Sequence, residues 1–439
     1  MRVQLTTLGC RLNEAELETW ARQFQEAGYQ LAEPGDEVDL LVLNTCAVTQ
    51  EAVRKSRNLT RRLKSRHPEA RVVLSGCHAT LAPEEANALG VDLVIGNPDK
   101  HRLVELTQAR HPPHPLNPLP PSAAAESVLF RLGRHRAFVK VQDGCRYRCS
   151  FCIVTKARGD ERSRPLAEIV EEVRHHGAQG LQEVVLTGVH LGGYGEDLGT
   201  HLTQLIETLL KESKIPRIRL GSLEPWDLPD GFIDLFAEPR LMPHLHLPLQ
   251  SGSDTILRRM ARRTRRHDFL GLVDRLRTRI PDINLTTDIL VGFPGEGADE
   301  WQETLSLIET VGFGNLHIFP FSPRPGTPAA SLPNRVPEAV KAARCEVLKH
   351  EAQRLLDLSR RRWIGTRRPV LFEGGAQRED GQYWISGYTP EYQKVYLNLA
   401  DEASGRALSY TIRDVQLTQP ARGSQGLEGE LCPETRSHG

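Results

Sequence analysis

Short apolar segments alternate with longer amphipathic segments through the first 365 residues, and this alternation restricts the fold more than any other feature. The apolar segments, such as 40–44 (LLVLN) and 72–76 (VVLSG), are nearly continuous and end at turn residues. Strands that are apolar on both faces belong in a parallel sheet with helices on each side. Residues 13–29 have helical spacing, with Asn13 placed to cap the helix. The pattern predicts an α/β fold that begins with an open parallel sheet.

Changes in composition divide the chain into domains. The first alternating block covers residues 1–110 and forms the N-terminal domain, and the proline-rich segment 111–130 predicts a linker. A second alternating block, 131–365, contains further strand patterns separated by helical patterns, without a sequence-level repeat. Such a series predicts a central partial (β/α)6 barrel of parallel strands.

The pattern changes to β after residue 365. Strand-like segments and turns follow one another through 366–418, without an amphipathic helix between them. This arrangement is typical of a small all-β barrel of the kind that binds nucleic acids. The last segment, 419–439, is rich in Gly, Ser, Glu and Pro and predicts a disordered tail.

The overall composition limits the class of protein. No run of 18 apolar residues occurs, so we expect no transmembrane helix, and the N-terminus lacks a secretory pattern. We therefore expect a cytoplasmic protein without a membrane partner. The chain has 56 Lys+Arg and 56 Asp+Glu, so any affinity for nucleic acid must come from local clusters. In a large reduced protein the 8 cysteines indicate metal ligands or packing residues rather than disulfides.

Three of these cysteines stand close together directly after a predicted strand. Cys145, Cys149 and Cys152 have C-x3-C-x2-C spacing, which allows three thiolates to reach one soft metal centre. Zinc usually takes four ligands, and so does a [4Fe–4S] cluster. Three thiolates therefore leave one iron of a cluster open for a small molecule, which indicates catalysis. The alternatives are a zinc loop or packing cysteines.

Three other cysteines share a position relative to predicted strands. Cys10, Cys46 and Cys77 each stand within two residues of the carboxyl end of a strand pattern. In an open parallel sheet these ends lie along one edge, where ligands bind. The sequence therefore predicts a second metal site, with three ordinary buried cysteines as the alternative. Cys345, within a helical pattern, we interpret as a core residue.

The spacing of Cys145, Cys149 and Cys152, with Phe151 before the last cysteine, resembles the radical S-adenosylmethionine (SAM) superfamily. The order LGCRLN, LNTCAVT and SGCHA, followed by this motif and a terminal β domain, resembles the methylthiotransferase family over roughly residues 2–418. The resemblance implies an auxiliary [4Fe–4S] cluster on Cys10, Cys46 and Cys77. It also implies a SAM-binding [4Fe–4S] cluster on the other three cysteines, and a C-terminal TRAM domain that grips RNA. It implies no catalytic residue beyond these cluster ligands.

The segments TLGCRLNEAE, QDGCRYRCSFC and TGVHLGGYG look most like the class that acts on threonylcarbamoyladenosine in tRNA. This class converts N6-threonylcarbamoyladenosine at position 37 to its 2-methylthio derivative. The implied partners are the tRNA anticodon stem-loop, an electron donor of the flavodoxin or ferredoxin type, and a sulfur source. The alternatives within the family are the isopentenyladenosine class, often with GCQMN, and the ribosomal-protein aspartate class, often with GCPKN. A non-catalytic iron–sulfur protein that binds RNA or senses redox state is the alternative of another class.

Polar residues near predicted strand ends are candidates for contacts with SAM, each with a loop turn or cap as its equal alternative. They are Gly188, Ser222, Glu224, Gln250, Ser251 and Asp288. Basic residues near the expected site are candidates for RNA-phosphate contacts, although such residues more often lie on a solvated helix face. They are Arg158, Arg162, Arg164, Arg258, Arg262, Arg263, Arg367 and Lys394. The TRAM-like segment is not basic overall, so its affinity would depend on placement, including that of the Tyr388 and Tyr392 rings.

Overall fold

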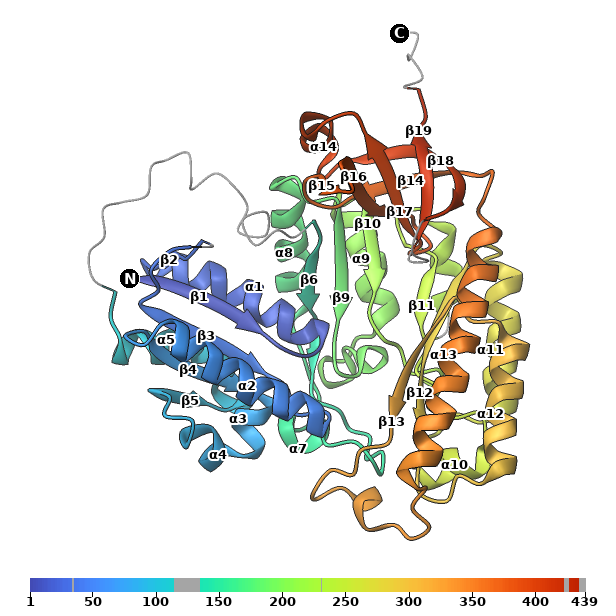
Figure 1. The fold of residues 1–439 in the computed structure, drawn as a ribbon, viewed down its shortest axis with the longest axis horizontal. Helices are drawn as coiled ribbons and strands as arrows, with labels where there is room; N and C mark the ends of the chain where they lie inside the picture. Colours follow the sequence, from blue (N-terminus) through green and yellow to red (C-terminus); the bar gives the residue numbers. More distant parts are fainter. Residues whose placement is uncertain (34, 114–134, 230, 422–425, 434–439) are drawn as a thin grey trace.

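The computed structural model describes residues 1–33, 35–113, 135–229, 231–421 and 426–433, which form three units (Figure 1). An N-terminal α/β unit lies beside a central barrel, and a small β unit lies over one end of that barrel. Most of the segment predicted as a linker, 111–130, lies outside the described residues. None of the described helices has the length and apolar character needed to cross a membrane.

The N-terminal unit contains a parallel sheet, as predicted. Its five strands have the order β2-β1-β3-β4-β5, and every neighbouring pair is parallel. The strands are β1 (Arg2–Thr7), β2 (Gln30–Leu31), β3 (Leu40–Thr45), β4 (Arg71–Gly76) and β5 (Leu93–Ile95). The helices are α1 (Arg11–Glu26), α2 (Gln50–Arg66), α3 (Cys77–Leu81), α4 (Pro83–Asn87) and α5 (Leu103–Arg110).

Strand β3 shows why the apolar pattern is continuous. Val42 packs on one face of the sheet with Phe24 of α1, and Leu43 packs on the other face with Leu63 of α2. Both faces are therefore covered by helices. The expected cap is wrong, because α1 begins at Arg11 and Asn13 lies in its first turn. There the Asn13 side chain donates hydrogen bonds to the carbonyl oxygens of Leu8 (2.8 Å) and Thr45 (3.3 Å).

The central unit is a barrel of six parallel strands, which confirms the predicted barrel architecture. They are β6 (Ala137–Lys140), β9 (Glu183–Thr187), β10 (Arg217–Leu220), β11 (His244–His246), β12 (Asn284–Val291) and β13 (Asn315–Pro320). They form two three-stranded sheets, and single parallel bridges such as Ser222–His246 join them. In the described residues β6 and β13 do not pair, so the barrel is open on one side.

Helices cover the outside of this barrel (Figure 1). The covering helices are α8 (Leu166–Ala178), α9 (Leu202–Glu212), α11 (Arg266–Arg279), α12 (Ala298–Val311) and α13 (Glu338–Arg361). Two short helices, α7 (Val154–Arg158) and α10 (Asp254–Arg259), and the two-residue strands β7 (Gln142–Asp143) and β8 (Arg162–Ser163) complete the unit. Cys345 of α13 belongs to the apolar core beneath these helices, as expected.

The N-terminal unit packs against one edge of the open barrel, at β6. Helix α1 runs alongside β6 (Figure 1), and the Glu18 carboxylate accepts a hydrogen bond of 2.9 Å from the Phe138 backbone amide. Sequence positions more than a hundred residues apart are thereby joined at the barrel edge.

The C-terminal unit is a closed β barrel. Its strands are β14 (Arg367–Phe372), β15 (Gln377–Glu379), β16 (Gln382–Tyr388), β17 (Lys394–Leu399), β18 (Ile412–Pro420) and β19 (Leu427–Leu431). The order β14-β18-β19-β17-β16 closes through the β14–β16 pairing, and β15 extends β16. Two details differ from the expectation. The first is a short helix, α14 (Glu402–Leu408), which lies between β17 and β18.

The second correction concerns the predicted disordered tail, 419–439. Residues Leu427–Leu431 form β19, which pairs with β17 and β18, so the barrel extends beyond residue 418. The tail prediction is wrong here because Leu427 fills the core beside Val395 and Val415. The segment is rich in Gly and Glu, so its composition does not reveal a strand whose Leu427 side chain points into the barrel core.

The C-terminal unit covers the amino-terminal end of the central barrel (Figure 1). Arg217, the first residue of β10, donates hydrogen bonds to the carbonyl oxygens of Tyr388 (3.0 Å) and Pro369 (2.7 Å). Asn284, the first residue of β12, donates a hydrogen bond to the Glu391 carbonyl oxygen (2.7 Å). This end of the barrel is therefore capped by the segment between β16 and β17.

Candidate active site between two cysteine triads

The N-terminal cysteine triad, Cys10, Cys46 and Cys77, lies at one edge of the first sheet. Cys46 directly follows β3, Cys77 directly follows β4, and Cys10 precedes α1 shortly after β1. The register aligns the ends of these strands, with Thr7, Asn44 and Ser75 side by side. The expected convergence is therefore confirmed.

Gly9 shows how closely these elements approach. Its φ of 124° lies in the region that favours glycine. A Cβ atom at Gly9 would lie 3.1 Å from Cys46 Sγ, so only a glycine lets the turn before Cys10 pass this thiol. Burial, together with the neighbouring Cys77 and Cys10 thiols, raises the pKa of Cys46 to about 11. These thiols need a positive partner or a metal to become thiolates at neutral pH.

The loop cysteine triad, Cys145, Cys149 and Cys152, lies between β7 and α7. The turn is closed by a hydrogen bond of 3.0 Å from the Cys152 amide to the Cys149 carbonyl oxygen. Burial raises the pKa of Cys145 to about 12 and that of Cys152 to about 11, and the neighbouring thiols add to both shifts. The thiols of this loop, like those of the N-terminal cysteine triad, therefore need a positive partner or a metal to become thiolates at neutral pH.

The spacing of the sulfur atoms within both triads differs from that around a single zinc ion. Tetrahedral zinc with Zn–S bonds of about 2.3 Å brings its sulfur ligands to within about 3.8 Å of one another. Among the described residues, the one group of three potential ligands lying within 4.8 Å is His246, Asp288 and His317, and neither cysteine triad meets that spacing. The three sulfur atoms of each cysteine triad therefore do not all lie within 4.8 Å of one another.

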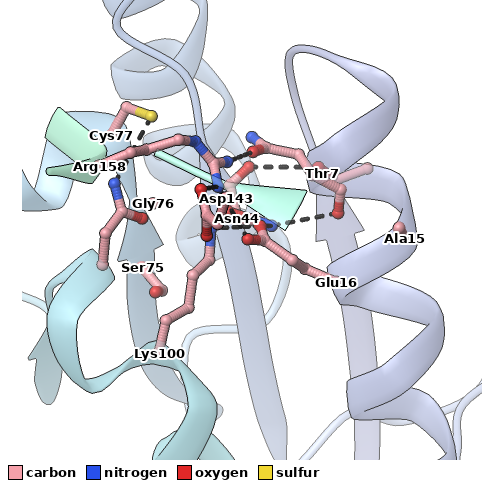
Figure 2. Close-up of polar contacts among 12 residues, drawn as sticks. Thr7, Ala15, Glu16, Asn44, Ser75, Gly76, Cys77, Lys100, Asp143 and Arg158 are labelled. Carbon is pink, nitrogen blue, oxygen red and sulfur yellow. Dashed lines mark hydrogen bonds and ion pairs between the residues drawn. The ribbon is translucent and has the colours of Figure 1, made fainter. Parts of the chain in front are cut away.

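Arg158 joins the two triads through a buried charge network (Figure 2). It ends α7, six residues after Cys152, and its guanidinium lies 3.0 Å from both Glu16 Oε1 and Asp143 Oδ1. It also donates a hydrogen bond of 2.7 Å to Asn13 Oδ1, and α1, which carries Asn13 and Glu16, starts directly after Cys10. Arg158 is only 4% exposed, so its prediction as an RNA-phosphate contact is wrong.

Lysine side chains complete this network. Lys100 pairs with the other oxygen of Glu16, and Lys140 lies 3.2 Å from Glu16 Oε1. Burial alone would raise the pKa of Glu16, but Lys100 and Arg158 hold it well below its usual value. On the N-terminal side, Asn97 donates to Cys77 Sγ (3.7 Å) and to the Ala157 carbonyl oxygen (2.7 Å). The relative position of the two triads is therefore set by charge-assisted contacts.

Arg262 is also buried and not available to RNA. Its guanidinium pairs with Glu224 at 2.6 Å, approaches Cys149 Sγ at 4.0 Å and stacks 4.3 Å from the Trp226 ring. Its prediction as an RNA contact is wrong, because Arg262 turns inward while its neighbours Arg263 and Arg258 are exposed. Glu224 lies at the edge of the loop cysteine triad, where a SAM contact was expected, and its contact with SAM stays a prediction.

The remaining SAM candidates occupy different environments. Ser251 is buried against α12, with its hydroxyl 3.3 Å from Thr304 Oγ1, and its contact with SAM stays a prediction. Gly188 packs against Gln142, whose Oε1 would lie 2.9 Å from a Cβ at this position. Ser222 is exposed at the carboxyl end of β10, and Gln250 has a positive φ of 75° where its backbone bridges β12. SAM contacts by Gly188, Ser222 and Gln250 stay predictions.

Asp288 belongs to a triad on the inner face of the barrel that the sequence did not reveal. Its Oδ1 lies 3.1 Å from His246 Nε2 and 3.2 Å from His317 Nδ1, and the two imidazole rings stack at 5.1 Å. Burial alone would raise the pKa of Asp288, but the two histidines lower it well below its usual range. Both histidines alternate with apolar residues on short strands. This alternation is the sequence signal that could have placed them on the inner face of the barrel.

The other basic candidates lie at or near the surface. Arg162, Arg258, Arg263 and Arg367 are exposed, while Arg164 and Lys394 are half-buried. Arg164 pairs with Glu172 at 2.6 Å, and Arg367 pairs with Asp414 at 2.7 Å. RNA contacts by these six residues stay predictions.

The two tyrosines expected to stack on RNA have another role. Tyr388 and Tyr392 stack on each other at 4.7 Å and contact the Arg136 guanidinium at 4.9 and 5.2 Å. Tyr392 also packs 4.9 Å from the ring of His244, on the inner face of the barrel. The rings therefore dock the C-terminal unit onto the barrel, and the expectation of RNA stacking is wrong.

Comparisons with known proteins agree with this architecture. A family model described as the radical SAM superfamily matches residues 139–308, and one described as uncharacterized protein family UPF0004 matches residues 2–96. The chain is 40% identical to the threonylcarbamoyladenosine tRNA methylthiotransferase MtaB of Thermotoga maritima, over 89% of the chain and 90% of that protein. It is 33% identical to the tRNA-2-methylthio-N(6)-dimethylallyladenosine synthase of Staphylococcus haemolyticus, over 94% of the chain and 82% of that protein.

Solved structures share the fold at low sequence identity. The radical S-adenosylmethionine methyltransferase TsrM from Kitasatospora setae, with cobalamin and a [4Fe–4S] cluster bound, superposes with a TM-score of 0.54. The alignment covers 75% of this chain and 77% of that chain at 17% identity.

Proposed function

The chain belongs to the radical SAM methylthiotransferase family, as its 40% identity to the Thermotoga maritima protein over 89% of its length shows, and we propose that its substrate is tRNA with N6-threonylcarbamoyladenosine at position 37. The product is the 2-methylthio derivative of that nucleoside. The observation that carries the proposal is the pair of cysteine triads on neighbouring units, joined by the buried Arg158.

Members of this family use SAM and [4Fe–4S] clusters, and the six cysteines are assigned as the ligands. Cys10, Cys46 and Cys77 hold the auxiliary cluster, and Cys145, Cys149 and Cys152 hold the SAM-binding cluster. When bound, these groups supply a carbon-centred radical that removes hydrogen and the methylthio group that replaces it. The raised pKa values of Cys46, Cys145 and Cys152 support the assignment, because metal binding provides the positive charge that buried thiolates need.

The chain's own residues position these groups. Arg158 and Glu16 hold α7 against α1, so the two triads keep a constant separation. Arg262 forms an ion pair with Glu224 and packs over the Trp226 ring, next to the Cys149 thiol, and so holds this side of the loop in place. A primary carbon radical reacts with the nearest C–H group, so this rigidity is part of the chemistry.

The RNA partner is assigned as the anticodon stem-loop. Arg162, Arg258 and Arg263 are exposed on the barrel unit and are available for phosphate contacts, which position RNA without reading its bases. Reduction of the SAM-binding cluster requires an electron donor of the flavodoxin or ferredoxin type, and sulfur transfer requires a sulfur source. We place this activity in the cytoplasm, where tRNA is used.

Nucleoside mass spectrometry of tRNA tests the proposal. Cells lacking the gene should accumulate N6-threonylcarbamoyladenosine and lose its 2-methylthio derivative. The wild-type gene and Cys345→Ala should restore the product, whereas Cys46→Ala should not, since Cys345 lies in the helical core. An unchanged level of the 2-methylthio derivative in the deletion strain would contradict the proposed substrate.

The same measurement tests the isopentenyladenosine substrate, which the Staphylococcus haemolyticus relative makes the second candidate. Loss of the 2-methylthio isopentenyl nucleoside alone would establish that substrate instead. A non-catalytic iron–sulfur protein would fail to cleave SAM to 5′-deoxyadenosine after anaerobic reconstitution and reduction.

A further inference from the structure

The capped end of the barrel carries an excess of buried positive charge. Glu183 of β9 is only 1% exposed and faces three guanidinium groups on the inner side of the barrel. Arg219 lies 3.1 Å from Glu183, Arg136 lies 3.5 Å from it, and Arg217 lies 4.0 Å from it. Burial and the neighbouring cations lower the pKa of Arg217 to about 10, although Glu183 opposes this shift. Arg136 also pairs with Glu373 at 3.5 Å, and the Glu391 carboxylate, which pairs with Arg368, acts on Arg217, so these carboxylates balance much of this charge but include no partner for a further cation.

Arg11 adds a further cation to the same region from the N-terminal unit. It is the first residue of α1, directly after Cys10, and its guanidinium carbon lies 5.8 Å from the centre of the Tyr392 ring. Arg219 contacts the same ring at 4.6 Å. Desolvation lowers the pKa of His244 well below its usual value, and the charges of Arg219 and Arg11 lower it further. Arg11 therefore points into the barrel and not into bulk solvent.

The guanidinium of Arg11 has no hydrogen bond or ion pair with any residue that the structure describes. The other arginines of this region differ, since Arg217 and Arg219 donate to backbone carbonyl oxygens as well as approaching Glu183. A half-buried guanidinium presents five donors in a planar fork that matches a carboxylate. Leaving these donors unpaired is unfavourable, so the position is suited to an anionic ligand.

The acidic group on the same inner face does not neutralise Arg11. Asp288 is held by His246 and His317, both near 3 Å from the same oxygen. Solvent reaches this part of the inner face, since the His317 side chain is 49% exposed and Phe319, two residues along β13, is 42% exposed. A ligand group can therefore approach the region from the open side while Asp288 stays paired.

We infer that Arg11 forms a carboxylate-binding subsite on the inner face of the barrel and receives the carboxylate of the threonylcarbamoyl group. The inference rests on the proposed function and deepens it, because it names the residue that selects an anionic N6 substituent. An apolar isopentenyl group would leave the guanidinium unpaired. A site that loses a buried polar contact in this way rejects the wrong substrate strongly. The position directly after Cys10 places this selection beside the assigned auxiliary cluster.

Binding of anticodon stem-loops to the reconstituted full-length enzyme tests this subsite. The probes are one stem-loop with N6-threonylcarbamoyladenosine and one with unmodified adenosine at position 37. Wild type should prefer the modified stem-loop, and Arg11→Gln should reduce that preference roughly 10- to 100-fold, the value of a charged hydrogen-bonded pair. Arg11→Lys should retain part of it. Arg22→Gln, at a partly exposed position on the same helix, should behave as wild type.

Other outcomes identify other ligands for Arg11 and overturn the inference. Equal weakening of both stem-loops would make Arg11 a phosphate contact. Loss of SAM binding without any change in stem-loop preference would make it a contact for the methionine carboxylate. An unchanged preference in Arg11→Gln, with iron content intact, would remove the residue from recognition. If wild type instead methylthiolates only the isopentenyl substrate, the proposed function itself fails.

Discussion

Arg158 Nη1 lies 3.0 Å from Glu16 Oε1, and this buried ion pair joins the segment after one cysteine triad to the helix that follows the other (Figure 2). Both side chains are almost fully enclosed, at 2% and 5% exposure. An ion pair in such a position is costly to break because the remaining charge stays buried. The contact therefore links domain docking to the geometry of the reaction centre.

Arg158→Met should destabilise the protein by about 3–5 kcal/mol, since Glu16 and Asp143 lose their shared counter-charge. Denaturant unfolding monitored by circular dichroism measures this change. Arg174→Ala, which breaks an exposed pair with Glu212, is the matched control and should cost less than about 1 kcal/mol. Equal effects of the two substitutions would show that the network does not stabilise docking.

Cys10→Ala should remove roughly half of the reconstituted iron, because one of two four-iron clusters loses a ligand. The methylthiolated product should disappear, while reductive cleavage of SAM to 5′-deoxyadenosine continues at the loop cysteine triad. Iron analysis and product chromatography on the same preparation measure both. Full iron content with normal product formation would return Cys10 to the role of a packing residue.

His190 should make the stability of the cysteine loop depend on pH. Desolvation opposes its charged form, but Asp227 at 2.6 Å and Glu161 on the other ring nitrogen raise its pKa overall. A raised folded-state pKa gives stability that is full below the unfolded value and is lost as pH rises through the folded value. His190 packs at 4.8 Å against the ring of Tyr147, within the loop.

The melting temperature should therefore fall between pH 6 and pH 9 in the wild type, and His190→Gln should flatten this part of the profile. Differential scanning calorimetry of the reconstituted protein measures it. His201→Gln is the control, since its side chain caps α9 away from the loop. A profile that keeps its slope in His190→Gln would assign the pH dependence to another group.

Leu427→Ala should destabilise the C-terminal barrel by about 2–5 kcal/mol, because Leu427 is fully buried in its core. Leu431→Ala on the same strand should cost less than about 1 kcal/mol, since Leu431 is 45% exposed. Hydrogen exchange of β17 and β18 amides reports the local effect. Unchanged exchange in Leu427→Ala would show that β19 does not support its neighbours.

Much of the candidate site follows from local sequence. Cys10, Cys46 and Cys77 converge because each ends a strand, and parallel strands end at a common edge. The spacing of Cys145, Cys149 and Cys152 confines them to one loop without knowledge of the rest of the chain. Strand and helix periodicity likewise predicted the parallel sheet and the barrel.

Other roles depend on partners far away in sequence. Arg158 and Arg262 were predicted as RNA-phosphate contacts, yet they are buried in ion pairs with Glu16 and Glu224. Tyr388 and Tyr392 looked like RNA platforms, yet they insert against Arg136 and Arg219 at the end of the barrel.

Only the tertiary structure decided which charges are buried, which rings dock domains, and that Arg11 points into the barrel. The physical reason is that desolvation and pairing depend on everything packed around a side chain, and those neighbours come from distant parts of the chain.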